Sequence, residues 1–149
     1  MSGRSRMVGS AAALVTALSL SSYGANAQGV DFQLNSMKSS GVAGDFCDIF
    51  YDVINNSAIY IGRGFASTVI RDKDGRILDK GGVRFGRTKP HETVAGEDLF
   101  YNLDCRDVTS IQVVLTEVTV AGDLYTYDKV PKELLDGKNS SLIIGVNVK

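Results

Sequence analysis

Two cysteines place the strongest constraint on how this chain can fold, because each lies in a short β-prone run. Cys47 opens an alternating run that continues to Ile54, and Cys105 closes a similar run that begins near Leu99. Apolar and acidic side chains alternate in the first run, which predicts a strand with one buried and one solvated face. The face expected to be buried carries Cys47, Ile49, Tyr51 and Val53, and the other face carries Asp48, Phe50, Asp52 and Ile54.

We expect these two runs to be adjacent antiparallel strands with Cys47 directly opposite Cys105. The numbers of opposed residues then sum to 152, which pairs Ile49 with Leu103, Tyr51 with Tyr101 and Val53 with Leu99. Every inward pair is apolar or aromatic, as cross-strand packing favours. Opposed strand residues have Cα atoms about 4.5–5.5 Å apart, a spacing that a disulfide accepts. A Cys47–Cys105 disulfide is therefore predicted, and two buried free thiols are the alternative.

The first 27 residues have the pattern of a cleaved signal peptide. Arg4 and Arg6 precede an uncharged apolar stretch over 7–20, and Ala25-Asn26-Ala27 fits the small-x-small rule for cleavage before Gln28. The apolar stretch is shorter than the roughly 20 residues that a membrane span needs. We therefore predict a secreted or periplasmic protein whose mature chain, 28–149, forms one domain without a membrane span. An uncleaved N-terminal anchor is the alternative.

The charge of the mature chain argues against a nucleic-acid or anionic-membrane partner. Removing Arg4 and Arg6 leaves 14 of the 16 basic residues. Against 17 acidic residues, this gives the mature chain a net charge of about −3. No run of Lys and Arg stands out, whereas binding to phosphates depends on clustered basic side chains.

The rest of the chain reads as about seven to nine short strands without an amphipathic helix of useful length. Asp72-Lys73-Asp74-Gly75 predicts a hairpin turn between two aliphatic pairs, and 109–120 is the most β-rich stretch. Gly81-Gly82 is expected to interrupt a strand, and 86–96 is expected to be the longest loop. This pattern favours an all-β, antiparallel β-sandwich of the immunoglobulin or fibronectin III class. A small closed barrel is the alternative.

The sequence offers little that would support catalysis. The single histidine, His91, lies in the predicted long loop beside Pro90 and Glu92, and the chain has no Gly-x-Ser-x-Gly nucleophile motif. One histidine with both cysteines in a disulfide makes a poor zinc site. We therefore predict no enzyme, no metal and no cofactor. A hydrolase or metal-dependent domain centred on His91, with Glu92 or Glu97, is the less favoured alternative.

Aromatic side chains are the best candidates for contacting a partner. Phe50 and Phe100 fall on the outer face of the two cysteine-bearing strands in the predicted register, where they would lie diagonally near each other. Tyr125 and Tyr127 are expected to share one face of a later strand. Exposed aromatic patches are typical of protein interfaces. The alternative is that neighbouring segments cover these side chains.

Two segments resemble small exported immunoglobulin or fibronectin III-like domains. They are Val53-Ile54-Asn55-Asn56-Ser57 and the later hairpin from Val69 to Leu78, with Asp72-Lys73-Asp74-Gly75-Arg76 at its centre. Within this class, the secreted bacterial interleukin-receptor-mimic family is similar in size, signal peptide and all-β build. The resemblance implies a protein partner and a homodimer rather than catalysis, and it assigns no functional residues to this chain.

Taken together, these features predict an exported, non-enzymatic binding module that acts on a protein partner through a sheet face or an edge strand. An envelope structural or assembly accessory protein is the alternative.

Overall fold

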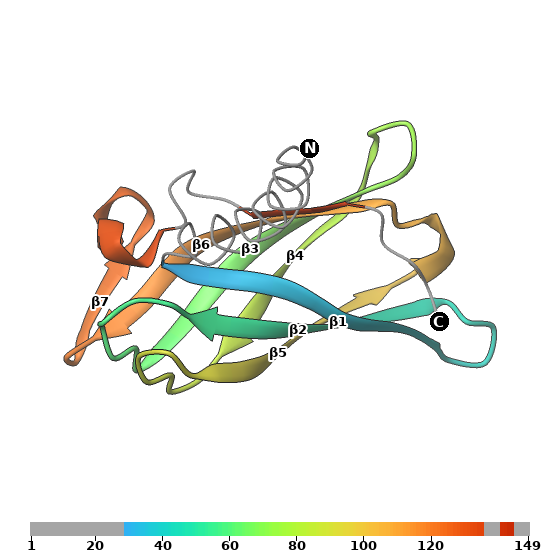
Figure 1. The fold of residues 1–149 in the computed structure, drawn as a ribbon. Helices are drawn as coiled ribbons and strands as arrows, with labels where there is room; N and C mark the ends of the chain where they lie inside the picture. The colour runs from blue at the N-terminus through green and yellow to red at the C-terminus, as the bar shows by residue number, and fades with distance from the viewer. Residues whose placement is uncertain (1–28, 136–140, 145–149) are drawn as a thin grey trace, which may run out of the picture.

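A computed structural model describes residues 29–135 and 141–144, and the chain in this part is almost entirely β-structure (Figure 1). The expected signal peptide and the end of the expected last strand, 145–148, lie outside the described residues. The strands are β1 (Val30–Ser40), β2 (Phe46–Asn55), β3 (Arg63–Arg71), β4 (Ile77–Phe85), β5 (Thr93–Tyr101), β6 (Ser110–Val120), β7 (Asp123–Thr126) and β8 (Ser141–Ile144). Three single-turn 3-10 helices follow β5 and β7: η1 (Cys105–Asp107), η2 (Tyr127–Lys129) and η3 (Lys132–Leu134).

All strand pairs are antiparallel, and together they form one curled sheet. Its order is β1-β2-β5-β4-β3-β6-β7, with β8 pairing beside β7 on β6. Figure 1 shows β1 and β2 in front of β3 and β4, so the curl encloses the core. Only Arg84 and Glu97 pair between β4 and β5. The predicted all-β, antiparallel class is confirmed, but the ladders join the strands continuously rather than showing the two separate sheets of a sandwich.

The buried face of the sheet supplies the hydrophobic core. On β2, buried and half-buried residues alternate along the whole strand, so the two predicted faces of this strand are confirmed. Burying an aliphatic or aromatic side chain contributes about 1.5–3 kcal/mol, so this alternation stabilises the sheet. The most deeply buried large side chains include Met37, Ile49, Tyr51, Val53, Ile61, Ile70, Ile111 and Leu134.

Strands β2 and β5 are antiparallel neighbours as predicted, but the predicted register is wrong. Cys47 lies opposite Phe100, so the numbers of opposed residues sum to 147 rather than 152. The shift is five residues, and an odd shift exchanges the two faces of a strand. The physical reason is that β5 begins at Thr93, inside the predicted loop, and ends at Tyr101 before the cysteine. Asn102 then turns the chain with a φ of 59°.

The predicted disulfide between Cys47 and Cys105 is confirmed. It connects β2 to η1 just beyond the end of β5, and the two Cα atoms are 5.1 Å apart. Asp104 caps η1 by accepting a hydrogen bond from the Arg106 N–H. With a sequence separation of 58, the chain-entropy model assigns this disulfide about 4 kcal/mol of stabilisation.

Phenylalanine rings pack closely on glycines within β3 and β4. Gly81-Gly82 was expected to break a strand, yet β4 runs through both residues and pairs with β3 along its length. The reason is that aromatic rings lie over glycines of the neighbouring strand, which fills the space that a side chain would occupy. A Cβ atom would overlap the ring in each of three pairs: Phe65 over Gly82, Phe85 over Gly64, and Phe100 over Gly81.

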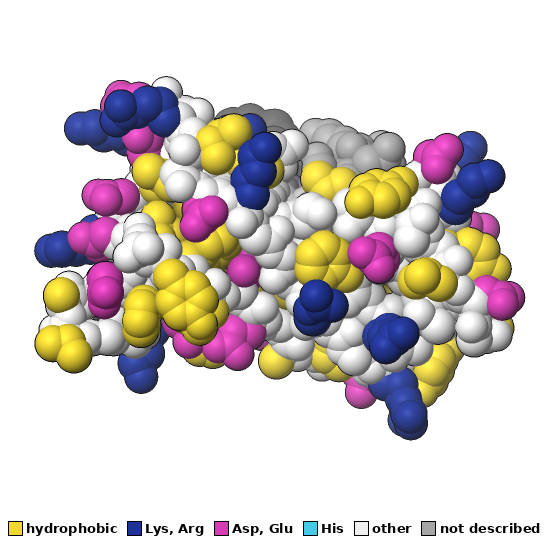
Figure 2. Space-filling view, turned by 180° about the vertical axis from the view of Figure 1, so that it is seen from behind, with side chains coloured by type: hydrophobic (Ala, Val, Ile, Leu, Met, Phe, Trp, Pro, Cys, Tyr) yellow, Lys and Arg dark blue, Asp and Glu magenta, His cyan; other side chains and the backbone are white. Residues whose placement is uncertain are grey.

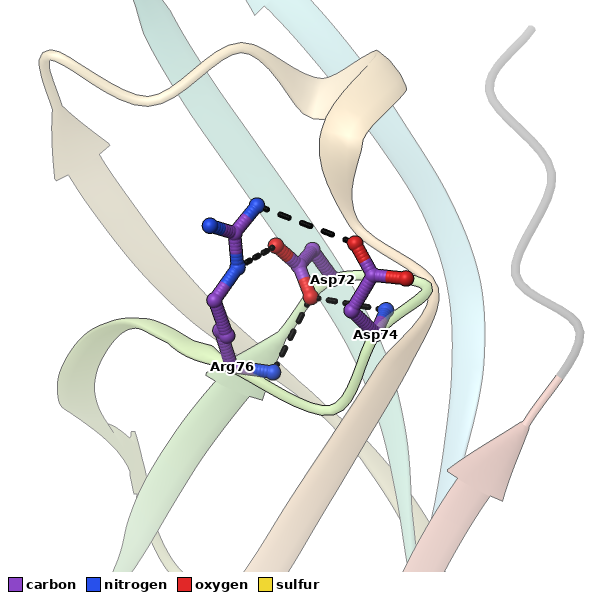
Figure 3. Close-up of polar contacts among 3 residues, drawn as sticks. All are labelled: Asp72, Asp74 and Arg76. Atoms are coloured by element: carbon purple, nitrogen blue, oxygen red, sulfur yellow. Dashed lines mark hydrogen bonds and ion pairs between the residues drawn. The ribbon is translucent and has the colours of Figure 1, made fainter.

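The predicted hairpin at 72–75 is confirmed, and its tip is fixed by Asp72 (Figure 3). Asp72 Oδ1 accepts hydrogen bonds from the N–H groups of Asp74 and Arg76 at 2.9 and 3.0 Å, and Oδ2 accepts from Arg76 Nε at 3.1 Å. Gly75 supplies the left-handed backbone, with a φ of 80°. Partial desolvation tends to raise the pKa of Asp72, but these hydrogen bonds outweigh it and hold that pKa below its ordinary value.

Replacing Gly64 should test how much the close packing of the Phe85 ring on β3 contributes to the free energy of unfolding. Gly64→Ala places a methyl group inside the ring of Phe85, which is 4% exposed and packs edge-on against Phe32. Because this ring is almost fully buried, we expect a loss of about 1–3 kcal/mol in the free energy of unfolding, measured by urea titration. Gly86→Ala is the matched control, since no atom approaches within 4 Å of its added methyl group. Equal stability of the two variants would contradict this explanation.

Candidate functional site

An exposed apolar patch covers the outer side of β2 and β5, and we call it the aromatic face. It consists of Phe46 and Phe50 on β2 with Leu99 and Tyr101 on β5. Leu99 is 42% exposed and Tyr101 is 62% exposed, whereas the two phenylalanines are half-buried. Phe46 and Tyr101 are opposed residues whose rings meet edge-on, with centroids 5.1 Å apart. Such pairs contribute about 0.5–1.5 kcal/mol beyond their buried area, so this face is locally ordered.

The aromatic face corrects the predicted Phe50–Phe100 pair. Phe50 lies on the outer side of β2, as expected. Phe100 is only 3% exposed and points inward, because the odd shift in register exchanges the faces of β5. The same shift brings Leu99 and Tyr101 outward in its place. The alternation of Leu99 and Tyr101 with Phe100 was visible in the sequence, but pairing Cys47 directly with Cys105 assigned Phe100 to the outer face.

Tyr125 and Tyr127 do not form the expected pair on one strand face. Strand β7 ends at Thr126, and Tyr127 starts η2 with a φ of 51°. Tyr125 is half-buried and packs against the core, whereas Tyr127 is 72% exposed. No local pattern in the sequence indicates that the strand ends between these two tyrosines.

Carboxyl groups border the aromatic face. Asp48 lies opposite Leu99 on β5, and Glu97 lies opposite Phe50 on β2. The Asp48 side chain is within hydrogen-bonding reach of Glu97, and this contact, together with the negative charge of Asp48, raises the pKa of Glu97. Asp48 Oδ1 is buried and accepts no hydrogen bond from the described residues.

Beneath the aromatic face, Asp98 on β5 forms hydrogen bonds with β3 and β4. It is 6% exposed, and Asp98 Oδ2 accepts a hydrogen bond from Thr68 Oγ1 at 2.6 Å. The Gly82 N–H also donates to its carboxylate. Burial raises the pKa of Asp98 to about 6, although the hydrogen bonds from Thr68 and Gly82 oppose the shift. The buried hydroxyl of Tyr51 lies near this carboxylate, and burial followed by the charge of Asp98 raises the pKa of Tyr51.

His91 is exposed in a turn that other groups hold in place. Its N–H donates to the Asn55 carbonyl oxygen at 2.7 Å, and its φ is 65°. Glu92 Oε1 accepts a hydrogen bond from the Lys89 N–H, so this carboxylate closes the turn. In the described ranges, no group of three His, Cys, Asp or Glu side chains gathers to hold a metal ion. The geometry around His91 is therefore that of a loop connection.

Comparisons with known proteins bear on the fold alone. No model of a known protein family matches the chain, and no curated protein matches its sequence. Among solved structures, the chain is similar to IrmA from Escherichia coli, with a TM-score of 0.54 and 11% identity. The match covers 72% of this chain and 89% of that one. Within the part that the structure describes, no helix is long and apolar enough to cross a membrane.

The buried Asp98 should give the protein a characteristic dependence of stability on pH. Its folded pKa of about 6 lies above the ordinary value of 3.8, so the folded state binds this proton more tightly. The free energy of unfolding should therefore fall as pH rises from about 4 to 6.5, by about 3 kcal/mol at most, and then level off. Asp98→Asn should remove this fall.

The measurement is urea unfolding at several pH values, with the difference between wild type and variant plotted against pH. Asp128→Asn changes the net charge equally at an exposed residue and serves as the control. A difference that is constant across pH 4–7 for Asp98→Asn would contradict a raised pKa at this residue.

Proposed function

We propose that this protein is an exported, non-enzymatic binding module that contacts a protein partner through the aromatic face. The observation that carries the proposal is the exposure of Leu99 and Tyr101 beside Phe46 and Phe50 on neighbouring strands. A folded domain rarely leaves such side chains together at its surface unless something binds them. Tyrosine and phenylalanine are also enriched at protein interfaces, where they give large contact areas.

The carboxyl border defines which partners suit this face. Asp48 and Glu97 place negative charge beside the apolar centre, which favours a partner with basic side chains around an apolar contact. A border of this kind mainly increases the rate of association, while the buried apolar contacts slow dissociation.

Export is supported by the Cys47–Cys105 disulfide, because disulfides persist in oxidising compartments and are rare in the cytosol. The signal-peptide pattern of residues 1–27 points the same way. We therefore place the protein in the periplasm or outside the cell.

The strand order supports a closer relation to fibronectin III-like domains. The groups β1-β2-β5 and β4-β3-β6 are joined by the single pair Arg84–Glu97, so each group would form one sheet of a sandwich. The similarity to IrmA and the motif resemblance around 53–57 and 69–78 agree with this assignment. A relation to the interleukin-receptor-mimic family, with its expected homodimer, belongs to the same proposal.

Cross-linked capture from the exported fraction tests the binding function. Mature protein, 28–149, is immobilised with its disulfide intact, and cross-linked proteins are identified by mass spectrometry. We expect the double variant Leu99→Ser and Tyr101→Ser to reduce capture of a specific partner at least tenfold, because both apolar contacts are lost.

The matched control is Tyr60→Ser with Ile77→Ser, which removes two side chains of comparable exposure, 46% and 51%, away from the aromatic face. Far-ultraviolet circular dichroism confirms that both variants are folded. Equal loss of capture in the two variants, or no loss in either, would contradict the assignment of this face.

A further inference from the structure

A second surface, on the outer side of β3, β4, β6 and β7, contains a hollow of about 220 Å³. Figure 2 views the molecule from behind, the side away from β1 and β2 in Figure 1. Hydrophobic side chains lie there among basic and acidic ones. The residues of the hollow that matter here are Arg63, Phe65, Arg84, Glu117, Thr119 and Leu124. Four strands contribute to it, so its shape is set by the sheet rather than by one loop.

Strand register fixes the positions of the charged groups in this hollow. Arg84 on β4, Phe65 on β3 and Glu117 on β6 are directly opposed in one row, and Arg63 lies opposite Thr119 in a neighbouring row. The Arg84 guanidinium lies over the Phe65 ring, 5.1 Å from its centroid. A guanidinium stacked on a ring loses little further freedom when it binds a ligand.

The two arginines of the hollow differ from those in the turns. Arg76 is paired with Asp72, and Arg106 is paired with Asp104 at 2.7 Å. Neither Arg63 nor Arg84 forms an ion pair with any residue of 29–135 or 141–144. Among the residues that line the hollow, two guanidinium groups and the carboxylate of Glu117 leave one net positive charge. Glu97 is opposed to Arg84 on β5 and lies outside this lining. The net charge of the lining suits a single carboxylate and is too small to retain a polyanion.

The volume of the hollow selects between kinds of ligand. Pockets that bind small molecules usually measure about 300–1,000 Å³, so 220 Å³ is small for a ligand that must be enclosed. One acidic side chain fits, and Leu124, which is 61% exposed beside it, can take an apolar neighbour from the same partner. A planar guanidinium fork binds a carboxylate through two parallel hydrogen bonds.

We propose that this hollow binds the Asp or Glu side chain of a protein partner through Arg63 and Arg84, with an adjacent apolar residue of the partner packed on Leu124. The inference rests on the proposed binding function and names the chemistry of the partner at a second surface. The hollow adjoins the aromatic face, because Arg84 is opposed to Glu97 on the border of that face. It takes an acidic side chain, whereas the acidic border favours basic partners.

Titration of ¹⁵N-labelled mature protein with short peptides tests the proposal by NMR. The probes are the tripeptide amide acetyl-Leu-Glu-Leu and its glutamine analogue, acetyl-Leu-Gln-Leu. We expect the glutamate peptide to shift the amide signals of Phe65, Arg84 and Thr119 in a saturable way. The glutamine peptide should bind at least tenfold more weakly, because it lacks the charge that the two guanidinium groups recognise.

Variants then separate a site from general attraction between charges. Arg63→Gln and Arg84→Gln should each weaken binding about tenfold, and Arg84→Lys should weaken it as well because an ammonium group lacks the planar fork. Arg87→Gln removes an equal charge from an exposed residue outside the hollow and should leave binding unchanged.

Three results would overturn the inference: equal binding of the two peptides, equal loss with Arg87→Gln, or the same shifts from acetate at the same concentration. The last would make the hollow a site for free carboxylates. None of these measurements involves Leu99 or Tyr101, so the hollow can fail while the aromatic face still captures a partner. The aromatic face can likewise fail to capture a partner while the hollow still binds the glutamate peptide.

Discussion

The pairing of β2 with β5 is the interaction on which the rest of the structure depends. Its register decides which side chains of β5 enter the core, and the Cys47–Cys105 disulfide fixes the chain immediately after that strand. One face of this pair is buried, so a slip by one residue would place charged groups in the core. The register is therefore strongly specified even though β5 itself has mixed polar and apolar composition.

Both the surface and the interior of the molecule follow from this register. Leu99 and Tyr101 become exposed, and together with β2 they form the surface that we propose for binding. Asp98 becomes buried and bonds to Thr68 on β3, across the junction where β4 and β5 share only one residue pair. The buried carboxyl thus compensates for missing backbone pairing, at the cost of a raised pKa.

Local patterns in the sequence were sufficient for some elements and insufficient for others. The faces of β2, the hairpin at 72–75 and the disulfide depend on alternation, turn chemistry and cysteine count, which are readable without tertiary contacts. Placing Cys105 inside a strand caused the error in register and therefore the wrong position of Phe100. The continuity of β4 through Gly81-Gly82 depends on rings supplied by other strands, which local propensity does not contain. The hollow at Arg63 and Arg84 could not be predicted either, because its side chains come from strands that are distant in the sequence.

The most direct test of this account is the register of β2 against β5 in solution. Interstrand nuclear Overhauser contacts in the isotopically labelled mature protein report which backbone protons face each other. The account predicts contacts that connect Phe50 with Glu97 and Asp48 with Leu99, so that paired residue numbers sum to 147. Contacts between Phe50 and Asn102 instead would place Phe100 at the surface, and would contradict both the buried Asp98 cluster and the proposed binding face.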